Sequence, residues 1–138
     1  FENQSGALTV ARYNLGWVQI LIIMKRKPQI SWSDFEKVDI RVGIVVNAEA
    51  FPEARRPANK VWIDFGEEIG ELKTSAQITD LYNPTALIGR QVIAVVNFPR
   101  KQIGSFMSDC LLLGVVGDPG GIILLQPDRD SPIGLTIA

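Results

Sequence analysis

Short segments in which apolar and polar residues alternate constrain the fold of this chain more than any other feature. Apolar side chains occupy every second position in residues 40–47. The pattern recurs in residues 60–65, which are followed by Gly66. A period of two places successive side chains on opposite faces, so each segment predicts a strand with one buried face. Residues 91–97 are apolar almost throughout, which is typical of a strand buried on both faces.

Further strands are predicted in the second half of the domain and just after the alternating segments. A short one is expected at residues 72–76, and another at residues 111–116. Residues 122–125 add one more after the turn at residues 118–121, Asp-Pro-Gly-Gly. The strands are all short and are separated by turn residues, which favours an all-β domain.

Two short helices are expected beside these strands. Ser33 and Glu36 match a capping box, so a helical turn is predicted to begin there. Residues 78–88 show no strict alternation and contain Asn83 and Pro84, which is typical of a short or broken helix. This second helix would connect the third strand to the fourth.

The order of elements matches one barrel architecture. Three short strands, a helical connection and two further strands, after a short N-terminal helix, are the order of a five-stranded oligonucleotide/oligosaccharide-binding (OB) barrel. Another small β-barrel or a sandwich is the alternative, because lengths and spacing alone do not exclude it. The length of 138 residues is enough for one domain with a single core.

Charge and composition narrow the classes of function. The net charge of -1 excludes a protein that binds nucleic acid through bulk positive charge, so an anionic partner would need a local patch. The chain has no histidine, which is the usual acid/base group near neutral pH. Its one cysteine, Cys110, cannot form an internal disulfide, which suits a reducing, cytoplasmic setting. Its apolar neighbours predict a buried small hydrophobe rather than a nucleophile.

Residues 1–23 differ from the rest of the chain and are predicted to be foreign to the domain, which would span residues 24–138. They are expected to be either a tag or vector remnant, or a fused peptide that imitates a ligand, because Tyr13 and Trp17 are anchors that an extended peptide offers a groove. Their apolar stretch, residues 17–23, is too short to cross a bilayer, which needs about 20 residues.

Residues 97–108 are predicted to form a loop and are the first candidate binding segment. They combine an amide (Asn97), aromatic rings (Phe98 and Phe106), cations and a hydroxyl, which suit contact with an extended polar polymer. The alternatives stay open for each residue: the rings can be core, the cations can be solvated turn residues, and the Asn97-Phe98-Pro99 sequence can be turn chemistry.

A second group of candidates lies on the first strands and the loop between them. Arg55, Arg56 and Lys60 form a cationic cluster, for which a solvated loop is the alternative. Arg41 is expected either to line the groove or to pair with Asp39. The complete set of candidate residues for binding a peptide or RNA is Arg41, Arg55, Arg56, Lys60, Trp62, Ser75, Gln77, Asn97, Phe98, Arg100, Lys101, Phe106 and Ser108.

No arrangement of residues points to catalysis. Glu67, Glu68 and Glu71 cluster between glycines, which is typical of a solvated turn rather than an acid pair. The sequence contains no phosphate-binding glycine loop and no nucleophile elbow. We therefore expect a binding protein without enzymatic activity, metal or cofactor.

Several phrases of the sequence resemble one family. Residues 35–43 (FEKVDIRVG) resemble the opening signature of the tRNA-binding domain family, which includes C-terminal modules of some methionyl-tRNA synthetases. Residues 89–97 resemble its fourth strand, and Gly104 with Ser108 its glycine-to-serine segment. The resemblance implies an OB-fold and, for the wider family, binding of tRNA.

The likeness is greatest to the CsaA group, the small stand-alone bacterial and archaeal members, and covers about residues 32–138. Phrases such as residues 51–55 and 75–79 carry it. It implies a homodimeric export chaperone that binds unfolded preproteins as extended peptides and engages the SecA motor. After Ser108-Asp109 the wider family has glycine and methionine, whereas this chain has Cys110-Leu111. This departure favours polypeptide over tRNA or structured RNA, which stays the alternative ligand.

Overall fold

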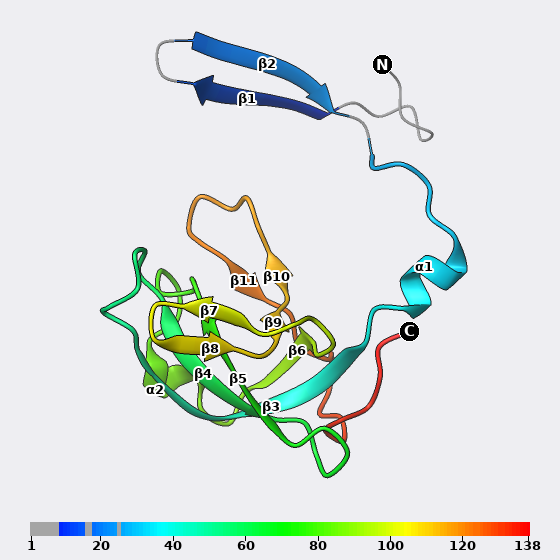
Figure 1. Cartoon of the computed structure of the whole chain (residues 1–138), viewed down its shortest axis with the longest axis vertical. Helices are drawn as coiled ribbons and strands as arrows, with labels where there is room; N and C mark the ends of the chain where they lie inside the picture. The colour runs from blue at the N-terminus through cyan, green and yellow to red at the C-terminus, as the bar shows by residue number, and fades with distance from the viewer. Residues whose placement is uncertain (1–8, 16–17, 25) are drawn as a thin grey trace. The chain divides into compact units, whose positions relative to one another are not determined.

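The computed structural model describes residues 9–15, 18–24 and 26–138, with side chains from Arg26 onward. The chain divides into two compact units between Phe35 and Glu36. In the first unit, β1 (Thr9–Leu15) and β2 (Val18–Met24) pair as an antiparallel hairpin (Figure 1). Residues 1–8 and 16–17 lie outside the described residues, and Trp17 is among them. The foreign origin of residues 1–23 stays a prediction.

The second unit is the predicted five-stranded antiparallel barrel, and the OB-type architecture is confirmed. Its strands lie in the order β5-β4-β3-β6-β9 (Figure 1). The two outer strands, β5 and β9, meet near Asp109, whose backbone N–H donates to Lys73 O at 2.7 Å, so the barrel is nearly closed. The strands are β3 (Ile40–Ala50), β4 (Asn59–Asp64), β5 (Glu71–Ala76), β6 (Gln91–Val95) and β9 (Leu111–Leu112).

Strand β3 is long because it has different partners along its length. Its first half, Ile40 to Ile44, pairs with β6, and Ile44 to Ala50 pair with β4, with a bulge between Val45 and Asn47. The bulge bends the strand so that one strand can belong to both sides of the barrel. The other edge of its first half is covered by the tail, residues 134–137, through Ile137 N donating to Ile40 O at 2.8 Å.

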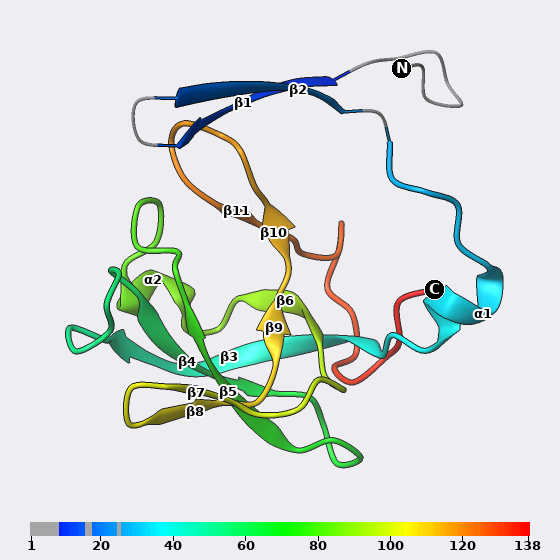
Figure 2. The same cartoon turned by 45° about the horizontal axis from the view of Figure 1, so that its top comes forward.

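Two small hairpins depart from the sequence-based expectation. The sequence predicts a loop at residues 97–108, but β7 (Lys101–Ile103) and β8 (Phe106–Ser108) form a hairpin within them (Figure 2). The expected single strand at residues 111–116 is divided into β9 and β10 (Gly114–Val115), and β10 pairs with β11 (Ile123–Leu124). The interruption lies at Leu113, and at the next residue, Gly114, an added Cβ would lie 2.9 Å from the backbone oxygen of Ile123, so the close approach of β11 favours glycine.

Both helices are shorter or differently capped than predicted. Helix α1 (Trp32–Glu36) begins after Ser31, not Ser33: Asp34 N donates to Ser31 Oγ at 3.1 Å and Ser31 N donates to Asp34 Oδ2 at 3.1 Å. This is the reciprocal pairing of a capping box, with aspartate in place of glutamate. Helix α2 (Pro84–Leu87) covers only four residues of the expected 78–88 and is capped by Asn83.

The core lies inside the barrel and explains the alternation of the strands. Every second residue of β4 is buried, namely Asn59, Val61 and Ile63. Leu87 of α2 is also fully buried, so the helix closes one end of the barrel. The largest fully buried side chains are Phe51, Phe65, Ile63, Leu87, Val45, Val61, Val92 and Asn59. Among the described residues, no helix is long and apolar enough to span a bilayer.

Candidate functional site

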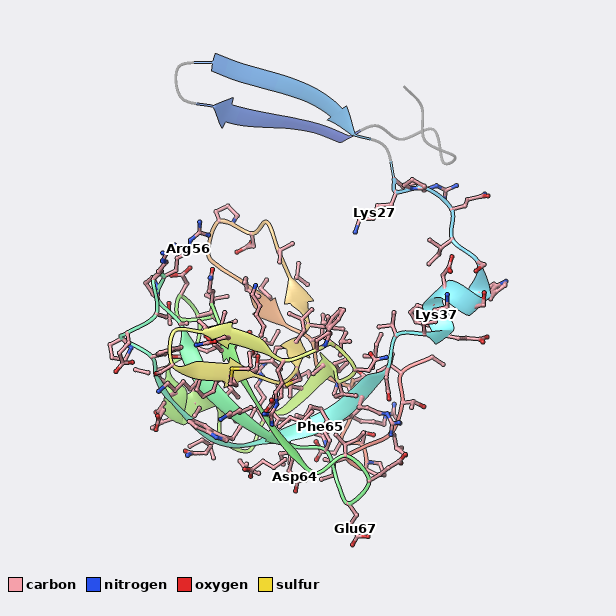
Figure 3. All side chains as sticks on the ribbon, in the orientation of Figure 1. Lys27, Lys37, Arg56, Asp64, Phe65 and Glu67 are labelled. Atoms are coloured by element: carbon pink, nitrogen blue, oxygen red, sulfur yellow. The ribbon has the colours of Figure 1, made fainter. Side chains whose placement is uncertain are left out.

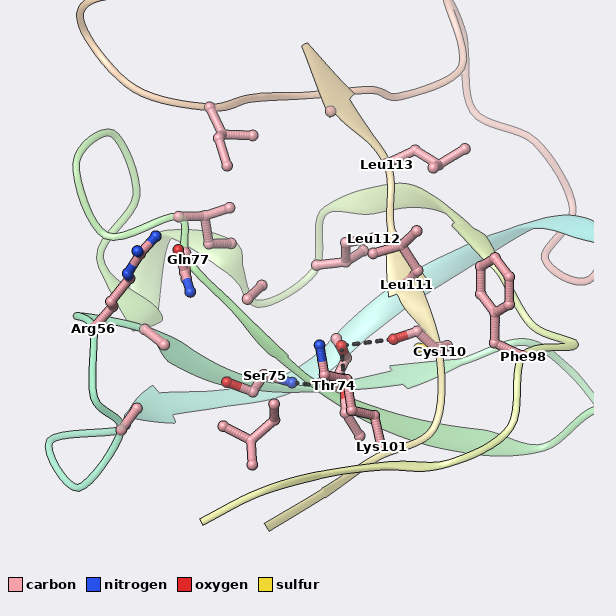
Figure 4. A pocket seen from close by; sticks show the side chains of 18 of the residues that line it. Arg56, Thr74, Ser75, Gln77, Phe98, Lys101, Cys110, Leu111, Leu112 and Leu113 are labelled. Atoms are coloured by element: carbon pink, nitrogen blue, oxygen red, sulfur yellow. Dashed lines mark hydrogen bonds between the residues drawn. The ribbon is translucent and has the colours of Figure 1, made fainter. Parts of the chain in front are cut away.

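An open pocket of about 1330 Å³ lies between β5 and β9, the two outer strands of the barrel sheet. One wall is formed by residues 74–78 and the other by residues 110–114. Residues 53–56, from the loop before β4, and residues 101–104, from the β7–β8 hairpin, also line it. Figure 4 shows Leu111, Leu112 and Leu113 along one side and Gln77 with Arg56 on the other.

The pocket exists because the two outer sides of the barrel sheet are joined over only part of their length. Lys73 and Ser75 of β5 are bonded to residues 108–109: Lys73 N donates to Asp109 Oδ2 at 3.4 Å and Ser75 N donates to Ser108 Oγ at 3.2 Å. Past Ser75, no strand of the described chain pairs with the outer edge of β5. The end of β5 and the start of β10 therefore separate, and apolar side chains line the gap.

A chain of hydroxyl groups forms the polar part of the pocket floor. Thr74 Oγ1 donates to Cys110 O at 2.8 Å, so its hydrogen is committed. The 2.8 Å contact between the Thr74 and Ser108 hydroxyls must then use the Ser108 hydrogen. Figure 4 shows Thr74 and Cys110 joined in this way. Both hydroxyls are buried and paired, so Ser108 mainly holds the two edges of the barrel together.

Cys110, whose backbone oxygen accepts from Thr74, is buried, as predicted. Burial raises its pKa from the ordinary 9.0 to about 12, and the Asp109 carboxylate adds to the rise. Between these pH values the unfolded chain releases a proton that the native state keeps, so stability falls as pH rises.

We therefore expect Cys110→Ala to reduce the loss of folding stability between about pH 8 and about pH 10. Urea unfolding of the wild type and the variant at both pH values measures the difference. Contributions from all other groups are common to both proteins and cancel in the comparison. An unchanged loss in the variant would contradict the assignment.

Exposed cations surround the apolar part of the pocket. Arg55 and Arg56 reach it from the loop before β4, and Lys101 reaches it from β7. The only carboxylate in the lining is that of Glu53. In the described part of the chain, none of these three cations has an ion pair, whereas Arg100 pairs with Asp109 at 2.8 Å. The edge of the pocket is therefore positively charged.

The structure brings seven of the thirteen predicted residues together in this pocket. Phe98 is 55% exposed and lies in the lining, so its ring is not part of the core. The seven are Arg55, Arg56, Ser75, Gln77, Phe98, Lys101 and Ser108. The six that do not line the pocket are Arg41, Lys60, Trp62, Asn97, Arg100 and Phe106.

Two of the six are occupied by bonds within the barrel. Arg41 pairs with Asp39 at 2.6 Å and donates to Gly134 O at 3.0 Å, which fixes the tail against β3. The bond to Asp39 raises the pKa of Arg41. The Asn97 side chain accepts from Asp39 N at 3.0 Å and donates to Lys37 O at 2.7 Å. Its carboxamide thus continues the sheet instead of facing an open groove.

An aromatic cluster holds the β7–β8 hairpin to the barrel. The Phe106 ring is 7% exposed and packs 5.6 Å from Phe51 and 6.0 Å from Trp62, between ring centroids. The Lys60 ammonium lies 4.6 Å from the Phe51 centroid and 5.4 Å from the Phe106 centroid. These contacts place the hairpin, and with it Lys101, at the edge of the pocket.

Sequence reasoning misses the apolar lining. The pattern at Leu111, Leu112 and Leu113 predicts only a strand, and nothing in the sequence distinguishes Thr74. Leu111 is 48% exposed, although its neighbours in the sequence are apolar. The period of a strand shows which side chains share a face, but not that two strand edges separate beside them.

Comparison with known proteins agrees with this architecture. A family model described as "Putative tRNA binding domain" matches residues 40–136. The methionine–tRNA ligase of Methanocaldococcus jannaschii is 32% identical over 110 residues, which cover 80% of this chain. The chain spans about one sixth, 16%, of the length of that relative.

Two solved structures are more similar. The crystal structure of chaperone CsaA from Bacillus anthracis has 48% sequence identity and a TM-score of 0.76, and the match covers 80% of this chain and 100% of that chain. The CsaA chaperone protein of Picrophilus torridus has 48% identity, a TM-score of 0.74 and the same coverage. The chain therefore belongs to the tRNA-binding domain family and, within it, is grouped with CsaA.

Proposed function

We propose that this domain is a chaperone that binds extended apolar segments of unfolded polypeptides in the pocket between β5 and β9. The observation that carries the proposal is the apolar lining of an open pocket of about 1330 Å³. Sites for single small molecules usually measure about 300–1,000 Å³, so this one is large enough for several consecutive side chains. The kinship with proteins named as chaperones supports the same function.

The backbone beside the pocket suits an extended ligand. The N–H groups of Lys73 and Ser75 are bonded by side chains of residues 108–109, and no strand of the described chain covers the edge at Gln77. An open strand edge binds a peptide as an added strand, with pockets beside it for alternate side chains. Main-chain bonds at the edge would give affinity for many sequences, and the leucines of residues 111–113 would select apolar ones.

We further propose that the chain acts as a homodimer in protein export in the cytoplasm. The β10–β11 hairpin carries Val115, Val116, Ile123 and Leu125, all exposed, and a second copy would cover apolar surface of this kind. A single buried cysteine suits a reducing compartment. Engagement of SecA belongs to the proposal through the resemblance to the CsaA group alone.

Substitution of a pocket leucine tests the proposed function. We expect Leu111→Asp to weaken binding of a labelled apolar peptide at least about 10-fold, because a carboxylate would be desolvated against the bound side chains. Leu135→Asp is the matched control, since Leu135 is 53% exposed and does not line the pocket. Fluorescence anisotropy measures affinity, and light scattering of an unfolded client measures chaperone activity. Equal affinity for both variants would refute the pocket as the binding site.

Binding of tRNA or structured RNA is the second candidate, favoured by the matched family description and by the cations around the pocket. Phosphate contacts release counterions, so RNA affinity must fall steeply as salt rises. Binding of an apolar peptide depends on buried surface and is expected to respond weakly to salt. Titration of the same protein with tRNA and with the peptide, each at two salt concentrations, separates the two functions.

A further inference from the structure

The charges of the barrel are unevenly distributed. Residues 36–138 contain ten lysines and arginines against thirteen aspartates and glutamates, a net charge of -3. The pocket is the reverse, because its lining has three cations and the single carboxylate of Glu53. Figure 3 places Arg56, beside the pocket, at the opposite end of the barrel from Asp64 and Glu67. The surface that receives the ligand is therefore positive on a negative domain.

The three cations of the pocket are available to a ligand. Arg41, Lys60, Arg100 and Arg129 each have a carboxylate within 4.0 Å. Arg55, Arg56 and Lys101 have no carboxylate partner among the described residues, and all three are exposed. A carboxylate that reaches them would not have to displace an existing partner.

Their positions suit the flanks of a ligand rather than its centre. The apolar part of the lining includes the leucines of residues 111–113 with Ile78 and Leu124. Arg55 and Arg56 belong to the loop before β4 and Lys101 to β7, so the cations come from different elements, and Figure 4 shows Arg56 and Lys101 on different sides of Ser75. Apolar side chains of a bound polypeptide segment would contact these apolar residues. The residues before and after them in the ligand would lie beside the cations.

We propose that Arg55, Arg56 and Lys101 select among polypeptide segments, and that the pocket prefers apolar segments flanked by aspartate or glutamate over those flanked by lysine or arginine. This inference rests on the proposed function and names its specificity. Arginine binds a carboxylate through two parallel N–H groups, and like charges at the edge of an interface discourage the wrong partner.

Three peptides with one apolar core and glutamate, glutamine or lysine flanks test the preference on the full chain. We expect the affinity to fall in that order, by about 10-fold from glutamate to lysine, because each exposed pair contributes modestly and several act together. Anisotropy measures the three affinities at low and at high salt. The differences should shrink at high salt, where exposed charges are screened.

Charge reversal identifies the residues responsible. The triple variant Arg55→Glu, Arg56→Glu, Lys101→Glu should reverse the order of the three peptides. Arg56→Glu and Arg129→Glu form a matched pair of single reversals, because Arg129 is exposed but lies outside the pocket. Only Arg56→Glu should reduce the difference in affinity between the glutamate-flanked and the lysine-flanked peptide.

Each remaining outcome is distinct. Equal binding of all three peptides would overturn the inference and leave the proposed function intact. Failure of the glutamine-flanked peptide to bind would instead refute the proposed function itself. A preference that survives in the triple variant would also overturn the inference. If tRNA binds more tightly than the glutamate-flanked peptide and loses affinity in the triple variant, the cations recognise phosphate and the inference is wrong.

Discussion

Phe106→Ala is expected to lower the free energy of unfolding by about 3–5 kcal/mol, the usual cost of removing a buried aromatic ring. Phe106 contributes the central ring of the cluster with Phe51 and Trp62 and is the buried residue of β8 nearest the turn. Without it the β7–β8 hairpin loses its main apolar contact with the barrel. Chemical denaturation measures the loss, and faster amide exchange in residues 101–108 would show where it occurs.

Phe98→Ala is the matched control for Phe106→Ala. The same ring is removed, but Phe98 is exposed and lines the pocket. The free energy of unfolding of the Phe98→Ala variant should stay within about 0.5 kcal/mol of the wild-type value, whereas its affinity for an apolar peptide should fall. Similar stability losses in both variants would contradict the distinction between an anchoring and a binding aromatic residue.

Gly134→Ala is expected to lower the free energy of unfolding by about 2–5 kcal/mol. This loss combines a steric overlap with the penalty for an unfavourable backbone conformation. Gly134 has φ +88, a conformation that side chains disfavour, and an added Cβ would overlap the backbone oxygen of Phe65. Phe65 is fully buried just after β4, so its backbone oxygen cannot move aside easily. The tail would then lose the bond from Gly134 N to Val42 O, at 2.7 Å.

Gly89→Ala separates the two contributions. Gly89 has φ +87 and also donates to a strand, at Val45 O, but an added Cβ there would meet nothing within 4 Å. It should cost only the backbone penalty of about 1–2 kcal/mol. Thermal or urea unfolding of the two variants measures both values. If Gly89→Ala is as damaging as Gly134→Ala, the overlap with Phe65 is not the cause.

The barrel strands are predictable from the sequence because burial follows their alternation. The strand expected at residues 40–47 lies within β3, which continues for three more residues, and the one expected at residues 60–65 is β4 shifted by one residue. The helix expected at residues 78–88 is less predictable. Ile78 and Leu87 are each buried, but as separate anchors of a connection in which only residues 84–87 are helical.

The β7–β8 hairpin has a signal in the sequence that is easily overlooked. Ile103 pairs with Phe106, so Gly104 and Ser105 form a two-residue turn, and Gly104 has φ +61. Glycine in the first central position is typical of a type II′ hairpin turn. The short strands and the polar residues around them conceal this pattern.

Polarity alone does not show which side chains face the ligand. Asn97 and Ser108 are as polar as Gln77, yet Asn97 is bonded to the backbone of residues 37 and 39. Ser108 is bonded to Thr74 and Ser75 of β5, where the two outer sides of the barrel sheet are joined. Their partners lie more than thirty positions away in the sequence, so no local pattern reveals them.

The bonds between the tail and the first barrel strand place the two ends of the domain side by side. Ile137 N donates to Ile40 O, so the chain enters and leaves the barrel at one edge. A domain whose ends meet can be attached to a larger polypeptide, or circularly permuted, without stretching its own structure. This geometry suits a portable module, and the barrel matches only about one sixth, 16%, of the length of a methionine–tRNA ligase.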